Sequence, residues 1–169
     1  MIFRITKHGE PVLKKRCEPL DYAGIKKDLP KLLKNMWETM YAANGVGLAA
    51  PQIGLSLRLS VIDVKPEGES APLVLINPEI VSHEGTMLEE EGCLSVPGLY
   101  AKVKRYGKVR VRALDENGEP WERTGTGLLA RAFQHEVDHL DGKLFVDHLG
   151  LVEKLRVAAI LKDLKKTWK

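Results

Sequence analysis

Two histidines and a glutamate stand at a spacing that suits metal chemistry. His135 and His139 are four positions apart, so on a helix their imidazoles lie on one face and can hold one metal ion. Glu136 follows the first histidine and can act as a general base toward a metal-bound water. Zinc, iron and nickel all accept imidazole, so the pair does not identify the metal. The alternative is an ordinary polar helix surface, because a five-residue pattern such as that from His135 to His139 also arises by chance.

A catalytic site of this type needs a third protein ligand and one open position. One protease pattern places a third histidine three residues after a glycine; here Gly142 fits, but Phe145 stands where the histidine belongs. The downstream carboxylates of Asp147 and Glu153 remain possible ligands of another protease type. Upstream, Cys93 lies in a segment with a glycine before it and a proline after it. Its thiolate would complete a set of one cysteine and two histidines.

Helices are predicted where apolar side chains recur every three or four residues. The first covers about 29–41, with Asp28 as its N-cap and Asn44-Gly45 as its stop. The second covers 127–141, carries both histidines and ends at a glycine. The third covers 151–169 and bears six basic side chains against two acidic ones. Its basic face is either a solvated surface with lysines that suit the helix dipole or a docking surface.

Strands are predicted between these helices. Short runs rich in β-branched residues or alternating in polarity lie at 57–64, 73–76, 78–83, 85–90, 102–104, 108–114 and 121–124. Asn117-Gly118 indicates a type I′ hairpin turn. Residues 45–54 are too small and glycine-rich for a regular element, and their glycines permit a close backbone approach. The pattern predicts an α+β fold, with short antiparallel sheets packed around a central metal-binding helix and a long C-terminal helix.

Length and composition favour one globular catalytic domain over residues 1–169. Hydrophobic residues make up 44% of the chain and charged residues 29%, and no apolar run reaches the eighteen residues that a membrane span needs. The N-terminal segment lacks an apolar signal core, so we expect a cytoplasmic protein. Cys17 is therefore expected to be a free thiol. The net charge of +3 is too small to indicate sequence-specific nucleic-acid binding.

Three stretches occur together in a characteristic order: Gly45-Val46-Gly47-Leu48-Ala49-Ala50-Pro51-Gln52, Glu91-Gly92-Cys93-Leu94-Ser95 and Gln134-His135-Glu136-Val137-Asp138-His139. With them the chain resembles a bacterial-type peptide deformylase over essentially its whole length. The resemblance implies a hydrolase that removes the N-formyl group from the formylmethionine of new polypeptides and releases formate. It also implies a divalent metal ion, Fe²⁺ in the cell, with Zn²⁺ or Ni²⁺ possible in purified protein.

The resemblance assigns roles to individual residues. By position, it implies the metal ligands Cys93, His135 and His139, with Glu136 as the catalytic carboxylate. Gln52 and the backbone N–H of Leu94 match the groups that bind the formyl oxygen. Backbone groups around Val46 and Gly47 resemble the edge along which the peptide lies. Val46, Leu128 and Ala132 are candidates for the wall of the methionine pocket, with plain core as the alternative reading of each.

Three further residues carry weaker expectations. The resemblance suggests an ion pair between Glu91 and Arg105 that fixes the cysteine loop, with two solvated charges as the alternative. Arg131 precedes His135 by one turn; it is either a substrate contact or, as we favour, a helix-surface residue whose aliphatic stem covers the core. A zinc endopeptidase and a binding protein with a structural metal are the competing functions. Mass measurement after incubation with a formyl-Met peptide separates all three functions, because only a deformylase removes the formyl mass alone.

We expect no membrane partner, and a transient ribosome contact through the basic tail helix.

Overall fold

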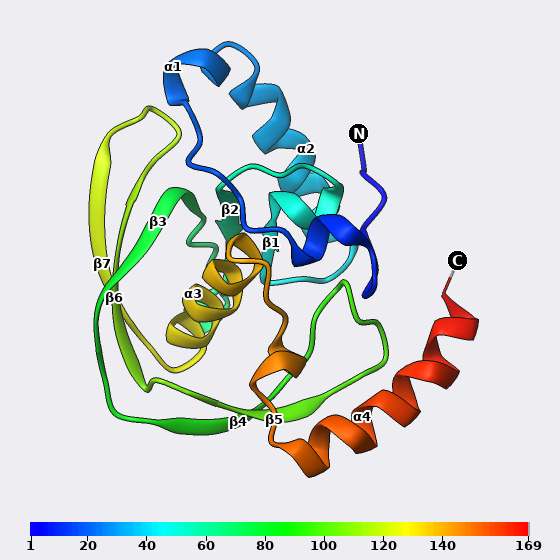
Figure 1. Cartoon of the computed structure of the whole chain (residues 1–169). Helices are drawn as coiled ribbons and strands as arrows, with labels where there is room; N and C mark the ends of the chain where they lie inside the picture. The colour runs from blue at the N-terminus through cyan, green and yellow to red at the C-terminus, as the bar shows by residue number, and fades with distance from the viewer. Residues whose placement is uncertain (169) are drawn as a thin grey trace.

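A computed structural model describes residues 1–168. Two antiparallel sheets and three long helices dominate the α+β architecture, as expected (Figure 1). The larger sheet has the strand order β1-β2-β3-β6-β7, and β4 pairs with β5 in the smaller one. The strands are β1 Gly47–Ala49, β2 Leu59–Ile62, β3 Leu73–Glu84, β4 Met87–Glu91, β5 Ala101–Arg105, β6 Lys108–Leu114 and β7 Pro120–Thr126. Within the described residues, no helix has the length and apolarity needed to cross a bilayer.

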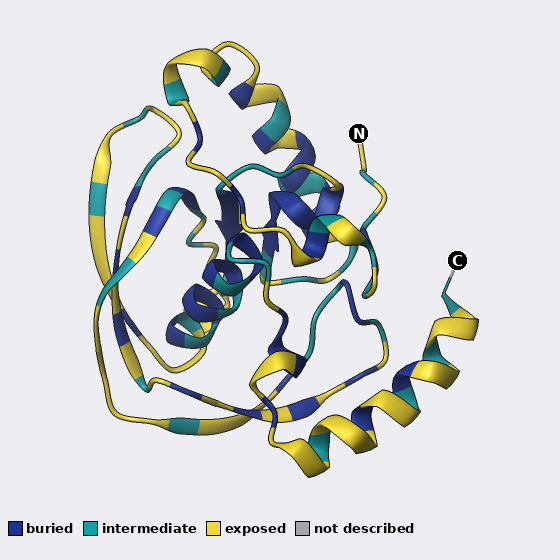
Figure 2. Ribbon diagram, in the orientation of Figure 1, coloured by how far each residue is buried: buried dark blue, intermediate teal, exposed yellow. Residues whose placement is uncertain are grey.

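Helix α3, Gly127–Leu140, is the centre of the fold and carries the two histidines. Its apolar side packs on the large sheet, where Phe133 lies among buried side chains such as Val109 and Val111 of β6. Figure 2 colours most of α3 as buried or intermediate. The helix ends where predicted, since Gly142 adopts a left-handed φ of 75°. The buried face of α3 thus fixes the rotation of the helix, and with it the direction of the histidines.

Two other helices cover separate parts of the core. Helix α2, Leu29–Ala42, packs its leucines and methionines against β1 and β2. The short helix α1, Tyr22–Ile25, leads into it. Helix α4, Leu151–Leu164, lies at the periphery, where Val157 and Leu161 are buried and its other side faces solvent (Figure 2). The tail was expected to be helical to its end; it continues as a 3-10 turn over Lys165–Thr167, and Lys169 lies outside the described residues.

Four short 3-10 segments connect these elements: Pro11–Lys14, Ala50–Ile53, Pro66–Gly68 and Phe145–His148. One of them corrects an expectation. The glycine-rich stretch 45–54 is not irregular, because it forms edge strand β1 followed by the turn Ala50–Ile53. The prediction failed because β1 has only three residues, and its pairing with β2 is a tertiary contact.

Three local predictions were wrong. Asp28 makes no side-chain cap, because the chain enters α2 with Asp28 already in helical conformation. The strands predicted at 73–76 and 78–83 are one strand, β3, interrupted by an irregularity at Asn77, whose φ is 51°. The β6–β7 hairpin has no type I′ turn: only Gly118 is left-handed, and its N–H donates to the Asp115 carbonyl at 3.0 Å. The Asp115 carboxylate also accepts the Asn117 N–H at 2.9 Å, which holds Asn117 out of the left-handed region.

Candidate active site

Three potential metal ligands converge at the inner end of a cleft. His135 and His139 lie on successive turns of α3, and their Nε2 atoms are 3.1 Å apart. Cys93 follows β4, and its Sγ lies 3.4 Å from His139 Nε2. All three ligand atoms lie within 4.8 Å of one another. Ligands around a tetrahedral ion stand about 3.4 to 3.6 Å apart, so this cluster fits a divalent metal that accepts thiolate and imidazole.

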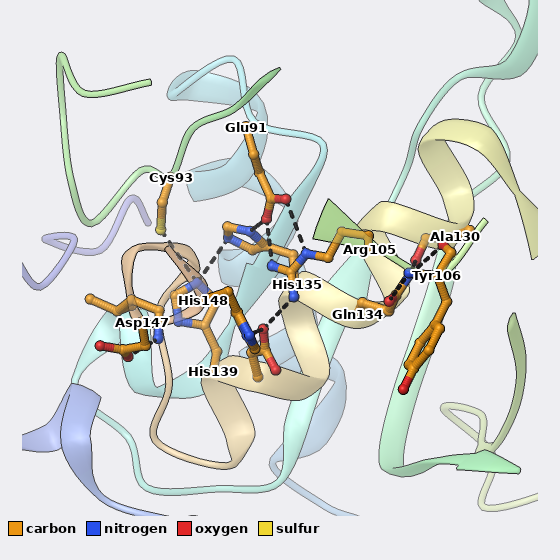
Figure 3. Close-up of polar contacts among 12 residues, drawn as sticks. Glu91, Cys93, Arg105, Tyr106, Ala130, Gln134, His135, His139, Asp147 and His148 are labelled. Atoms are coloured by element: carbon orange, nitrogen blue, oxygen red, sulfur yellow. Dashed lines mark hydrogen bonds and ion pairs between the residues drawn. The ribbon is translucent and has the colours of Figure 1, made fainter. Parts of the chain in front are cut away.

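A buried polar network orients one of these ligands (Figure 3). Glu91 Oε1 lies 2.5 Å from His135 Nδ1, and both oxygens of Glu91 accept hydrogen bonds from Arg105. Arg105 also donates to Asp138 at 2.6 Å, and His148 lies 2.7 Å from the same carboxylate oxygen. Burial acts to raise the pKa of Glu91, but the bonds from His135 and Arg105 outweigh it and lower the pKa to about 2. The expected ion pair is therefore present, and it also holds His135 with Nε2 toward Cys93.

The second histidine lacks such support. His139 Nδ1 is buried and has no hydrogen-bond partner within residues 1–168. Its Nε2 is the nitrogen that approaches both Cys93 and His135. The ring orientation is fixed instead by packing, because His139 is almost completely buried.

Glu136 is not part of the cluster of three potential ligands. Its side chain is buried against β1 and β2, where Oε2 accepts a hydrogen bond from Ser60 Oγ at 2.9 Å. Burial raises the pKa of Glu136 to about 7, and the charge of His135 and the Ser60 hydroxyl act in the opposite direction. A Cβ on Gly47 would collide with Glu136 Oε1. The absent side chain of Gly47 therefore leaves room for this carboxylate, a reason that the sequence did not indicate.

Polar groups from two other elements face the same space. Gln52 Nε2 donates to Ser95 Oγ at 3.2 Å and lies 3.6 Å from Cys93 Sγ, while its Oε1 accepts the Ala49 N–H at 2.9 Å. Hydrogen bonds to both the oxygen and the nitrogen of its side-chain amide therefore hold Gln52 with its nitrogen toward the cysteine. The N–H of Leu94 donates to no protein acceptor among the described residues. The Leu94 N–H can therefore bind an oxygen that carries negative charge, and the Gln52 N–H that faces Cys93 has only a weak sulfur acceptor to give up.

The cleft has a volume of about 540 Å³ and is open to solvent. The five candidate residues Val46, Gly47, Leu128, Ala132 and Glu136 all line it. Val46 and Leu128 are 41% and 44% exposed, so they form its rim, whereas Ala132 is buried in its wall. Arg131 also lines the cleft, and its Nε is buried without a partner within residues 1–168, so it stands where a bound substrate could reach it.

Sequence reasoning assigned no role to three residues of this site. Ser60 and Ser95 are completely buried and hydrogen-bond to Glu136 and Gln52, respectively. Gln134 bonds to both backbone groups of Tyr106 at 2.9 and 3.0 Å, which ties α3 to the turn between β5 and β6 (Figure 3). The signal for Ser60 was present, because a lone hydroxyl inside a run of apolar strand residues must find a buried partner.

Comparisons with known proteins agree with this geometry. A family model described as polypeptide deformylase matches residues 2–155. The chain belongs to this family. A peptide deformylase from Alkalilimnicola ehrlichii is 47% identical over 163 residues, covering 96% of this chain and 90% of the relative. A peptide deformylase from Thermodesulfovibrio yellowstonii is 51% identical over 154 residues, covering 90% of this chain and 92% of the relative.

Solved structures of the deformylase family share the fold. A peptide deformylase from Legionella pneumophila has a TM-score of 0.91 and 47% identity, covering 99% of this chain and 97% of that one. A Met-Ala-Ser-bound class I type b peptide deformylase from Acinetobacter baumannii has a TM-score of 0.84 and 38% identity, with coverages of 88% and 99%. As a member of this family the chain is a hydrolase.

Proposed function

We propose that this chain hydrolyses the formyl amide of N-formylmethionyl peptides and releases formate. The observation that carries the proposal is the convergence of Cys93, His135 and His139 beside the Glu136 carboxylate, on a cleft bordered by a free sheet edge. Membership of the deformylase family supports the same reaction. The related structure with Met-Ala-Ser holds a peptide that begins with the methionine a deformylated product would carry.

Cys93, His135 and His139 would hold one divalent metal ion. When bound, the ion supplies a Lewis acid that lowers the pKa of a coordinated water toward neutrality. Glu136 accepts the proton of the attacking water and later delivers it to the leaving amide nitrogen. Its pKa of about 7 suits both steps, because a group that must accept and return a proton works best near the ambient pH.

Gln52 Nε2 and the Leu94 N–H stabilise the oxyanion that forms on the formyl group. Both donors approach from the side of Cys93, and Gln52 is held in place before substrate arrives by Ala49 and Ser95. Such donors are already in place, so they do not have to reorganise during the reaction. Loss of one raises the activation barrier by about 3 kcal/mol.

The peptide backbone pairs with the free edge of β1. Val46 C=O accepts the Asp63 N–H at 2.8 Å, so the alternation of an antiparallel ladder turns the N–H and C=O of Gly47 away from β2. These two groups can bond an added strand, which reads main chain and tolerates many side chains. Val46, Leu128 and Ala132 then border the methionine side chain.

Metal identity and cellular context complete the proposal. We propose Fe²⁺ as the ion in the cell, with Zn²⁺ or Ni²⁺ replacing it in purified protein, since a thiolate and two imidazoles accept all three. Elemental analysis of protein isolated without oxygen tests this, and zinc as the dominant ion under those conditions would contradict it. We also propose a cytoplasmic enzyme that contacts the ribosome transiently through its basic tail helix.

The reaction is tested by incubating the protein with a formyl-Met peptide and measuring product mass. Loss of the formyl mass alone is expected. Internal fragments would instead support an endopeptidase, and an unchanged peptide would support a structural metal site.

The ligand set is tested with a pair of cysteine variants. Cys93→Ala should lose the metal and turnover, while Cys17→Ala should lose neither. Cys17 is the matched control because it is a buried free thiol outside the cleft. Full metal content and turnover in Cys93→Ala would contradict the three-ligand assignment.

A further inference from the structure

A single buried hydroxyl touches the proposed general base. Ser60 lies in β2 between Leu59 and Val61, and every residue of this strand is buried. The strand is paired on both sides, with Ser60 opposite Ala49 of β1 and Leu75 of β3. A hydroxyl in such an apolar setting is costly unless it is hydrogen-bonded, so its partners indicate why it is tolerated.

Ser60 Oγ has two acceptors within reach. One is Glu136 Oε2 at 2.9 Å, and the other is the carbonyl oxygen of Leu48 at 3.1 Å. A hydroxyl has one hydrogen and donates to one acceptor at a time. Hydrogen bonds to an ionised carboxylate are the stronger ones, so Glu136 is the preferred acceptor when it carries its charge.

The carboxylate of Glu136 is held between two elements of the sheet. Its Oε1 lies over Gly47, at the place where a Cβ would stand, and its Oε2 bonds Ser60. Within residues 1–168, Ser60 is the only residue that donates a hydrogen bond to the carboxylate of Glu136. The terminal torsion of a glutamate is otherwise broad, so this bond sets the plane of the carboxylate.

We propose that Ser60 is a positioning residue for the general base. By fixing Oε2, it keeps Oε1 as the oxygen that exchanges the proton with the attacking water. The inference rests on the role proposed above for Glu136. Ser60 does not line the cleft, so it makes no contact with bound peptide. Its loss should therefore lower kcat and leave KM and metal content unchanged.

The first experiment compares hydroxyl deletion with hydroxyl retention. Ser60→Ala should lower kcat roughly tenfold, the usual worth of a hydrogen bond to a charged group, with KM and metal content as in wild type. Ser60→Thr keeps the hydroxyl on a residue that suits a strand, and should retain most of kcat. Thr39→Val is the matched control, because it removes another buried hydroxyl, from α2, that does not line the cleft. Its kcat should equal that of wild type.

The second experiment is a double-mutant cycle with Glu136→Gln. If Ser60 acts through Glu136, adding Ser60→Ala to Glu136→Gln should change the residual kcat less than twofold. Three results would overturn the inference: wild-type kcat in Ser60→Ala, an equal tenfold loss in the Gln background, or a folded Ser60→Thr as slow as Ser60→Ala. Full activity of Glu136→Gln would be a different failure, since it would remove the proposed base itself.

Discussion

At the scale of single residues, Glu136 shows how burial adjusts a catalytic group. The carboxylate is enclosed by α3, β1 and β2, and this burial raises its pKa to about 7. The hydrogen bond from the Ser60 hydroxyl favours the ionised form and keeps the shift from being larger. The group thus stays close to the pH at which a proton can be both accepted and returned.

The pKa of Glu136 predicts how the rate depends on pH. The base acts when ionised, so kcat/KM should rise about tenfold per pH unit below pH 7 and level off above it. Glu136→Gln should keep the metal and lose turnover by a factor of roughly 10² to 10⁴, with this acidic limb absent from any remaining activity. Elemental analysis beside steady-state kinetics on a formyl-Met peptide measures both. Loss of metal in Glu136→Gln would mean that a ligand had been mistaken for a base.

Gly47 predicts a second residue-scale effect. In Gly47→Ala the new Cβ would collide with Glu136 Oε1, so the carboxylate must move. We expect kcat to fall by roughly 10²-fold, the usual cost of a catalytic group displaced by about 1 Å. Gly150→Ala is the control, because its Cβ would meet no atom within 4 Å and its φ of −66° suits alanine. Equal kcat values in the two variants would contradict this account of the glycine.

At the scale of elements, the site depends on how α3 is joined to the small sheet. Cys93 follows β4, while both histidines belong to α3. The chain from His135 through Glu91 and Arg105 to Asp138 begins and ends on α3 and passes through β4 and β5. It therefore fixes the distance between the cysteine and the histidines without using the ligand atoms themselves.

This junction should contribute stability that depends on pH. The pKa of Glu91 falls from 4.5 to about 2 on folding, so its contribution is complete above pH 4.5 and is lost as the pH falls toward 2. Glu91→Gln should lower the free energy of unfolding at pH 7 by about 3 kcal/mol, and the deficit should shrink with acidification over that range. Urea unfolding at several pH values measures this. Glu90→Gln, at an exposed neighbour, is the control, and an equal loss there would contradict the prediction.

The tail carries the second element-scale prediction. Lys162 of α4 is exposed, as are Lys165 and Lys166 of the 3-10 turn that follows it. Val157 and Leu161 pack the opposite side of α4 against the core. Reversing these three charges should weaken co-sedimentation with ribosomes, because attraction to nucleic-acid phosphates depends on cationic side chains and on salt. Turnover of a free formyl-Met peptide should stay unchanged. Unaltered, salt-insensitive co-sedimentation would count against the docking proposal.

At the scale of the whole molecule, separate hydrophobic clusters meet around the cleft. One packs α2 on β1 and β2, one packs α3 on the large sheet, and one joins β5 to α4. Each cluster contributes to one part of the cleft wall: Leu94 packs against the first, Ala132 belongs to the second, and Val96 and Leu99 belong to the third. The cleft lies between these clusters and is open to solvent. Strand β1 is at the edge of the large sheet beside it, so this edge is free for a peptide.

The sequence by itself determined what lies close along the chain. The four-residue spacing of His135 and His139 makes them neighbours on any helix, and the periodicity of α2 and α3 fixed which sides are buried. The type of ligand also followed from residue identity, since a cysteine and two histidines suit a divalent transition metal. The resemblance carried by the three motifs then placed the chain in its family.

Only the tertiary structure decided which distant residues meet. Ser60 and Glu136 are 76 positions apart, and no local pattern links them. The same holds for Gly47, whose missing side chain makes room for a carboxylate from another element, and for strand β1, which exists through its pairing with β2. The turn after β6 also followed the Asp115 carboxylate rather than the Asn117-Gly118 signal. Long-range packing selects among locally allowed conformations, because buried polar groups and ladder bonds must all be satisfied at once.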